Sequence, residues 1–170
     1  MSTTRRALLL SLPWAAAGLV ACGTAPPPRP AGPEAAPPRP PAEPPLVAER
    51  RWLQQWFEGT PVVIALQRDG ALSVAVPREF CFDTGRHAVK PALAAVLDKV
   101  ADSLRRQRAA RLDGLAVPDD AAANAALVRR RGTAVRAHLL GRGVPEARLA
   151  AASVAASPAV QLRIVMPPAA

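Results

Sequence analysis

The stretch from residue 124 to residue 140 reads Asn124-Ala-Ala-Leu-Val-Arg-Arg-Arg-Gly-Thr-Ala-Val-Arg-Ala-His-Leu-Leu140. Its apolar side chains recur at helical spacing, which predicts a helix with one buried face. Arg131 lies in line with that face, between Leu127 and Val135, and Asn124 lies near the helix start. A polar pair at one end of a packed helix is a candidate ligand site. The alternative is that Arg131 lies at the edge of the face and extends its guanidinium into water.

Composition favours one domain with appended segments. The chain has 170 residues and a formal net charge of +9, and a basic domain is attracted to anionic surfaces. The densest basic cluster, at residues 105–111, has no aromatic side chains near it on which bases could stack, so nucleic acid is not an expected partner. Basic residues at a helix end complement the helix dipole, which explains the cluster without a ligand.

The start of the chain resembles a bacterial lipoprotein signal. Arg5 and Arg6 precede an apolar run, Ala7–Ala21, that is short for a membrane span. The following Cys22-Gly23 resembles the end of a lipobox. The resemblance implies a signal peptide at residues 1–21, acylation of Cys22, and an outer-membrane protein whose domain faces the periplasm. Several acyl chains on Cys22 would anchor it stably; a chance cysteine after an ordinary signal is the alternative.

A proline-rich linker is expected at residues 22–45. Eleven of the 21 residues at 25–45 are proline, which prevents helix and sheet and favours polyproline II. At about 3.1 Å per residue this segment reaches roughly 65 Å. It would then lift a domain off a membrane, and a ligand for a proline-binding domain is the alternative.

Two features near the domain's beginning allow two interpretations each. Residues 46–59 predict an amphipathic helix with Trp52, Trp56 and Phe57 on one side; it packs on the domain, or it contacts a membrane surface or partner. If Cys22 is acylated, Cys81 is the single remaining thiol of the two cysteines. It is expected to be buried or half-buried, and an intermolecular disulfide is the alternative.

Residues 60–170 are predicted to form the folded domain. The runs at 62–66 and 71–76 predict strands, and Asp69-Gly70 between them predicts a two-residue hairpin turn. The later pattern predicts a helix at 91–108 and strands at 109–117 and 160–166. Asp119 or Asp120 is expected to cap the helix that follows.

The order of these motifs resembles an OmpA-like, peptidoglycan-associated domain across residues 71–166. Residues 124–135 are similar to N-x-x-L-S-x-x-R-A-x-x-V except at Val128 and Gly132. Residues 80–91 resemble the family's F-D-x-G-x-x-x-L-x-P motif, and residues 141–149 its G-V-x-x-x-R-L motif. The resemblance implies an α+β fold, a β-α-β-α-β two-layer sandwich, here with an additional N-terminal hairpin strand.

The resemblance also implies a ligand site. In OmpA-like domains that bind peptidoglycan, a loop Asp and the helix Arg bind diaminopimelate of the stem peptide, through its ammonium and its carboxylate respectively. Arg131 and Asn124 match the family helix. The loop Asp is missing after Gly114, and only Asp119 or Asp120 could replace it. Without that carboxylate the ligand's ammonium would be desolvated without a partner, which would weaken the binding free energy by about 1–3 kcal/mol or more.

We therefore expect a lipid-anchored protein that binds peptidoglycan non-covalently and tethers the envelope layers, with Arg131, Asn124, Asp119 and Asp120 as binding residues. The alternative is a degenerate domain of the same fold that contacts an envelope protein and not peptidoglycan. No enzyme, metal or cofactor is expected, because His87 and His138 have no nucleophile or metal-ligand spacing around them.

Overall fold

The computed structural model describes residues 43–118, 120, 124–155 and 158–167. The expected signal peptide, Cys22 and almost all of the linker lie outside these residues. Among the residues described, no helix is long and apolar enough to span a bilayer. The helices are α1 (Pro45–Trp56), α2 (Pro91–Arg106) and α3 (Ala125–Gly141), and the strands are β1 (Val63–Leu66), β2 (Leu72–Pro77), β3 (Arg111–Val117), β4 (Ala152–Val154) and β5 (Ala159–Val165).

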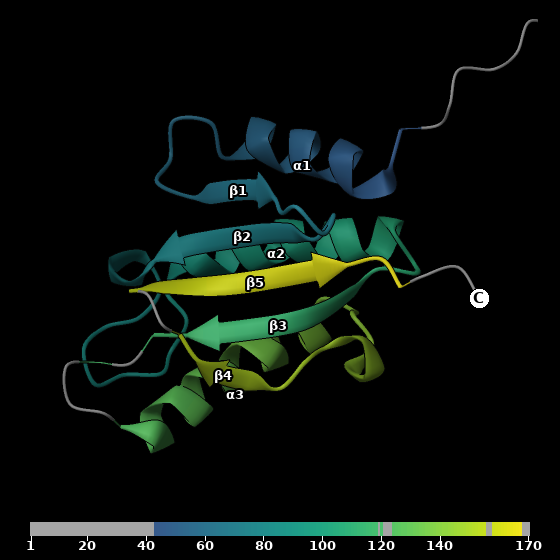
Figure 1. Ribbon diagram of the computed structural model, residues 1–170. Helices are drawn as coiled ribbons and strands as arrows, with labels where there is room; N and C mark the ends of the chain where they lie inside the picture. Colours follow the sequence, from purple (N-terminus) through teal and green to yellow (C-terminus); the bar gives the residue numbers. More distant parts are fainter. Residues whose placement is uncertain (1–42, 119, 121–123, 156–157, 168–170) are drawn as a thin grey trace, which may run out of the picture. The chain divides into compact units, whose positions relative to one another are not determined.

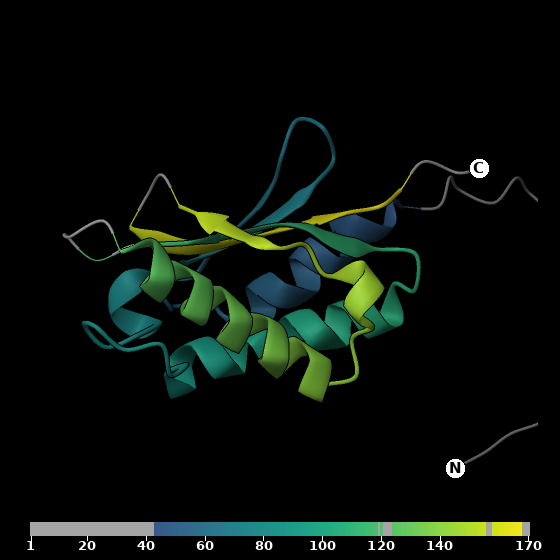
Figure 2. The same ribbon diagram turned by 90° about the horizontal axis from the view of Figure 1, so that it is seen from below.

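The strands form one sheet in the order β1-β2-β5-β3-β4 (Figure 1). Neighbouring strands are antiparallel except β3 and β4, which are parallel. The three helices cover the same face of this sheet (Figure 2). The α+β two-layer fold with an added N-terminal hairpin strand is thus confirmed. Strand β4 was not predicted, because three residues are too few to show an alternating pattern.

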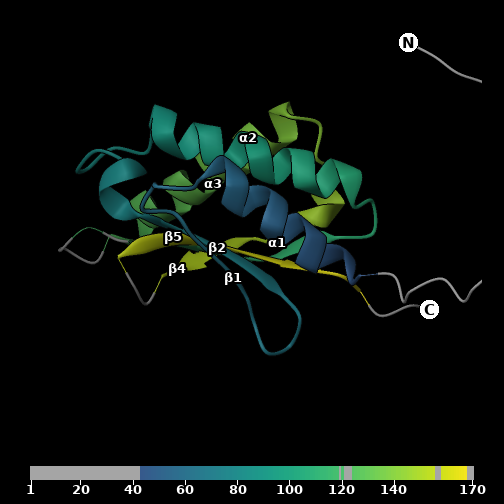
Figure 3. The same ribbon diagram turned by 90° about the horizontal axis from the view of Figure 1, so that it is seen from above.

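The core lies between the sheet and the helices. Alternate residues of β2 point into it, with Leu72 and Val74 fully buried. Helix α1 belongs to the same core through Leu46 and Leu53, which are 4% and 0% exposed, and it lies beside α2 (Figure 3). Packing of this helix on the domain, the first of the two interpretations, is therefore confirmed. Trp56 nevertheless remains 55% exposed.

Two local predictions were wrong. The connection between β1 and β2 is longer than a two-residue turn. The Gln67 amide donates to the Ala71 carbonyl at 2.8 Å, which extends the pairing of the two strands and leaves residues 68–70 as the loop. Gly70 has a φ of 79°, the left-handed conformation that such loops require. The cap of α3 is neither aspartate: Asn124 accepts a hydrogen bond from the Leu127 amide at 3.1 Å. A side-chain oxygen at this position satisfies an otherwise unpaired amide of the first turn.

Gly132 and Cys81 have clear packing roles. A Cβ at Gly132 would lie 2.1 Å from the Cβ of Ala152, so the glycine allows α3 to pack tightly on β4.

Cys81 is fully buried, as predicted, and its thiol lies 3.2 Å from the Pro77 carbonyl oxygen. Burial raises the pKa of this thiol to about 11, which makes it a packed and unreactive group at neutral pH.

Candidate functional site

Arg131 is the centre of the candidate site. It lies on α3 facing the sheet, and its side chain is 0% exposed. Its guanidinium carbon lies 4.9 Å from the centre of the Phe82 ring, within the range of a cation–π contact. Both interpretations from the sequence expected a guanidinium that solvent or a ligand can reach. The structure instead shows a guanidinium that is buried inside the protein.

Two loops satisfy the buried guanidinium. Nε donates to the Arg86 carbonyl at 2.9 Å, and Nη2 donates to the Asp83 carbonyl at 3.1 Å. Both acceptors lie in the loop that leads to α2. Nη1 donates to the Pro118 carbonyl at 3.0 Å, directly after β3. Arg131 therefore ties together two loops that are far apart in the sequence.

Asp120 completes this arrangement. Nη2 of Arg131 lies 3.0 Å from Oδ1 of Asp120 and 3.2 Å from Oδ2. The Gly85 amide donates to Oδ2 at 2.7 Å. The Gly85 hydrogen bond and the contact with Arg131 lower the pKa of Asp120, although partial burial opposes ionisation. The side chain is 18% exposed, so an anionic carboxylate is presented at the edge of a buried ion pair.

The other two residues predicted for the site are Asn124 and Asp119. Asn124 is exposed at the start of α3, and its side chain caps the helix. Asp119 lies outside the described residues. The structure thus brings together Arg131 and Asp120, and it places Asn124 at the N-terminal end of the helix that carries Arg131.

Sequence reasoning missed the loop at residues 83–86 as part of the site. The loop contributes backbone atoms, namely two carbonyls to Arg131 and the Gly85 amide to Asp120. Gly85 has a φ of 68°, a conformation that glycine adopts without strain. The signal was the resemblance to F-D-x-G, which indicates a loop of specific shape but no contact with Arg131.

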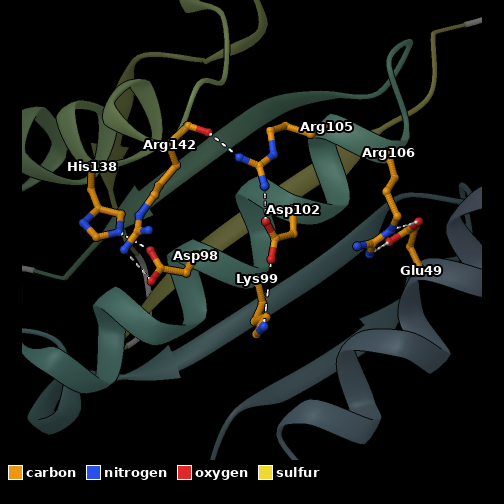
Figure 4. A network of polar contacts seen from close by, with 8 residues as sticks. All are labelled: Glu49, Asp98, Lys99, Asp102, Arg105, Arg106, His138 and Arg142. Atoms are coloured by element: carbon orange, nitrogen blue, oxygen red, sulfur yellow. Dashed lines mark hydrogen bonds and ion pairs between the residues drawn. The ribbon is translucent and has the colours of Figure 1, made fainter.

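Other polar clusters join helices to one another (Figure 4). His138 lies 2.6 Å from Asp98, which also accepts a hydrogen bond from Arg142 at 2.7 Å. On the other side of α2, Glu49 pairs with Arg106 at 2.6 Å. Across the described part of the chain, no group of three or more His, Cys, Asp or Glu side chains could hold a metal ion. These clusters are contacts between helices, whereas the Asp120–Arg131 pair orders loops.

Similar folds occur among solved structures. No protein-family model and no curated protein sequence matches the chain. A MotB-like protein from Desulfovibrio vulgaris matches with a TM-score of 0.57 and 20% identity over 71% of this chain and 92% of that chain. The periplasmic domain of MotB, residues 64–256, matches with a TM-score of 0.53 and 14% identity over 64% and 70%. The corresponding domain of Helicobacter pylori MotB, residues 90–256, gives 0.51 and 14% over 67% and 83%. The chain therefore has the OmpA-type fold of MotB-like periplasmic domains.

Proposed function

We propose that this chain is a lipid-anchored envelope protein whose OmpA-like domain binds peptidoglycan in the periplasm. It acts as a binding module and not as an enzyme. The fold supports this proposal, and the anionic Asp120 carboxylate, fixed at the protein surface by Gly85 and Arg131, is the observation that carries it. The ligand is the stem peptide, through its diaminopimelate residue.

Asp120 binds the ammonium group of diaminopimelate. A carboxylate with a lowered pKa remains anionic at neutral pH and forms a charge-assisted hydrogen bond with an ammonium. Arg131 positions Asp120 and the loop at residues 83–86, since its donors are used within the chain. Asn124, the N-cap of α3, and Asp119 are the further proposed contacts.

The anchor is Cys22, acylated after removal of residues 1–21 and inserted in the outer membrane. Residues 22–45 span the distance to the wall as a proline-rich stalk. A domain on such a stalk, bound to peptidoglycan, would tether the outer membrane to the cell wall without a covalent link. Acyl chains on Cys22 supply the membrane attachment.

A protein-binding role for the same fold is the second candidate. It is favoured by Trp56, which is 55% exposed on α1. Lys99 lies 3.6 Å from the centre of its ring, and Trp52 packs edge-on against it at 6.1 Å. Tryptophan is enriched among the residues that contribute most of the binding energy in protein interfaces.

Sedimentation with purified sacculi tests the first candidate. The full chain, purified in detergent, is compared with Asp120→Asn and with Asp102→Asn, a control that removes one carboxylate from α2. We expect Asp120→Asn to weaken binding about 10–100-fold, as loss of a charge-assisted hydrogen bond predicts. The control should bind like the wild type, and free diaminopimelate should compete.

Two outcomes would contradict the proposal. If the wild type does not sediment with sacculi, peptidoglycan binding is wrong, and a Trp56→Ala variant then tests partner binding. If Asp120→Asn and Asp102→Asn bind as tightly as the wild type, Asp120 is not the ammonium site.

A further inference from the structure

Helix α3 carries an unbalanced charge. Within Ala125–Gly141 there are four arginines and one histidine but no acidic residue. Three of these five side chains have partners: Arg131 pairs with Asp120, Arg136 with Glu146, and His138 with Asp98. Arg129 and Arg130 are exposed, and neither has a hydrogen-bond or ion-pair partner in the part of the chain that the structure describes.

Other arginines of the domain contact carboxylates: Arg105 pairs with Asp102, Arg142 with Asp98, and Arg163 with Asp69. Arg129 and Arg130 differ from these three because they are neighbours on one helix and have no carboxylate partner among the described residues. Two neighbouring guanidinia without a carboxylate repel one another and generate a local positive potential. Such a pair is stabilised when an anion binds.

These two arginines border a surface hollow. Together with His87 they line a space of about 460 Å³, whose other lining residues are small: Ala126, Thr133, Ala134 and Ala137. The lining contains no acidic side chain. Arg129 also borders a second hollow of about 560 Å³ together with Thr133 and Arg136. Small side chains between the cations let an extended ligand approach the helix surface.

The hollow and the Asp120 site share a loop, because the Gly85 amide donates to Asp120 and His87, two residues later, lines the hollow. Arg130 precedes Arg131 in α3, and His87 follows Arg86, whose carbonyl accepts a hydrogen bond from Arg131. A ligand that places an ammonium on Asp120 therefore has this surface next to it. The Arg131 side chain is 0% exposed, so the carboxylates of such a ligand need other cations.

We propose that Arg129, Arg130 and His87 form an anion-binding surface that takes carboxylates of the peptidoglycan stem peptide. This inference rests on the proposed function and names the groups that complete its site. Arg129 and Arg130 supply planar donors suited to carboxylates, and His87 adds an imidazole to the lining of the same hollow. The exposed arginines of this surface pair with the ligand's carboxylates, as the buried Arg131 pairs with the carboxylate of Asp120.

The test compares two double variants of the full chain in detergent. Arg129→Gln/Arg130→Gln removes the two cations of the hollow, and Arg68→Gln/Arg108→Gln removes two exposed arginines from other parts of the surface. Both variants lose the same net charge, so a general attraction to an anionic polymer weakens equally in both. Folding is checked by circular dichroism and by urea unfolding.

We expect Arg129→Gln/Arg130→Gln to bind native sacculi about tenfold more weakly than the control, the loss of two modest ion pairs. Sacculi whose carboxylates have been converted to amides should bind the wild type as weakly as native sacculi bind that variant. Soluble stem peptide should release the wild type from sacculi, and glycerol phosphate at the same concentration should not.

Each other result overturns the inference. Equal weakening of the two double variants leaves only a general charge effect. Equal competition by glycerol phosphate assigns the surface to phosphate anions such as lipid headgroups. If Asp120→Asn weakens binding but Arg129→Gln/Arg130→Gln does not, this inference fails while the proposed function stands. If the wild type does not bind sacculi, the proposed function fails first.

Discussion

Two buried charged side chains, Glu49 on α1 and Arg131 on α3, are satisfied in different ways. Glu49 is 5% exposed and receives hydrogen bonds from side chains: Arg106 at 2.6 Å and Gln107 at 3.1 Å. Arg131 is 0% exposed and donates mainly to backbone carbonyls of two loops. The first arrangement joins two helices, and the second holds loops that have no regular structure of their own.

The difference lies in what the partners can do when the buried charge is lost. Arg106 is 41% exposed and can turn its guanidinium to water. The carbonyls around Arg131 cannot turn without a change of loop conformation, and a buried acceptor left unpaired costs free energy. We infer that the loops of the candidate site depend on one side chain, whereas the α1–α2 contact is more tolerant.

Removal of Arg131 should give the largest effect. In Arg131→Met the apolar part of the side chain is retained, but three carbonyls lose their side-chain donor and Asp120 loses its cation. We expect the free energy of unfolding to fall by about 3–5 kcal/mol, measured by urea unfolding of the full chain. A loss below about 1 kcal/mol would show that the loops are held without Arg131.

Gly132→Ala tests whether tight packing of α3 on β4 supports the position of Arg131. Helix propensity alone predicts a gain of about 1 kcal/mol. The new Cβ would meet the Cβ of Ala152 at 2.1 Å, so we expect a net loss of about 1–3 kcal/mol in the same urea experiment. The double variant Gly132→Ala/Ala152→Gly should recover most of it. Stabilisation by Gly132→Ala alone would show that the packing is loose.

Glu49→Gln should destabilise the fold less than Arg131→Met does, because the guanidinium of Arg106 can turn toward water when its carboxylate partner is lost. We expect a decrease in the free energy of unfolding of about 1–2 kcal/mol, again from urea unfolding at neutral pH. A loss as large as that of Arg131→Met would remove the distinction between side-chain and backbone partners.

The pH dependence of Asp120 should be the smallest effect. Its folded pKa is lowered from 3.8 by the Gly85 amide and by Arg131. A lowered folded pKa stabilises the fold above the unfolded pKa, and this contribution is lost as the pH falls through the folded pKa. The stability difference between wild type and Asp120→Asn should therefore shrink when urea unfolding is repeated from pH 7 to pH 3. A constant difference would contradict ionisation of Asp120 in the native state.

The sequence predicted the helices and the longer strands because their patterns are local. The stripe at residues 91–108 and the alternation at residues 71–76 correspond closely to α2 and β2. The short strand β4 carried no pattern. Gly132 departs from the motif of OmpA-like domains, which have alanine there, and the structure gives the reason: Ala152 of β4 leaves no space for a Cβ at this position.

The candidate site was predictable only in part for the same reason. The helix motif identified Arg131, and Asp120 was one of two candidate carboxylates. The burial of Arg131 depends on acceptors at residues 83, 86 and 118, and periodicity says nothing about contacts between distant loops. The alternation of apolar residues could therefore not distinguish an arginine at the edge of the core from one inside it.

Titration calorimetry with a soluble stem peptide that contains diaminopimelate measures whether Asp120 binds the ligand. The titration compares the wild-type full chain with Asp120→Asn and Glu49→Gln, which each replace one hydrogen-bonded carboxylate by an amide. We expect the wild type and Glu49→Gln to bind the peptide with the same affinity and Asp120→Asn to bind it at least about tenfold more weakly. Equal affinity of all three proteins would contradict the assignment of Asp120 as the group that binds the ligand.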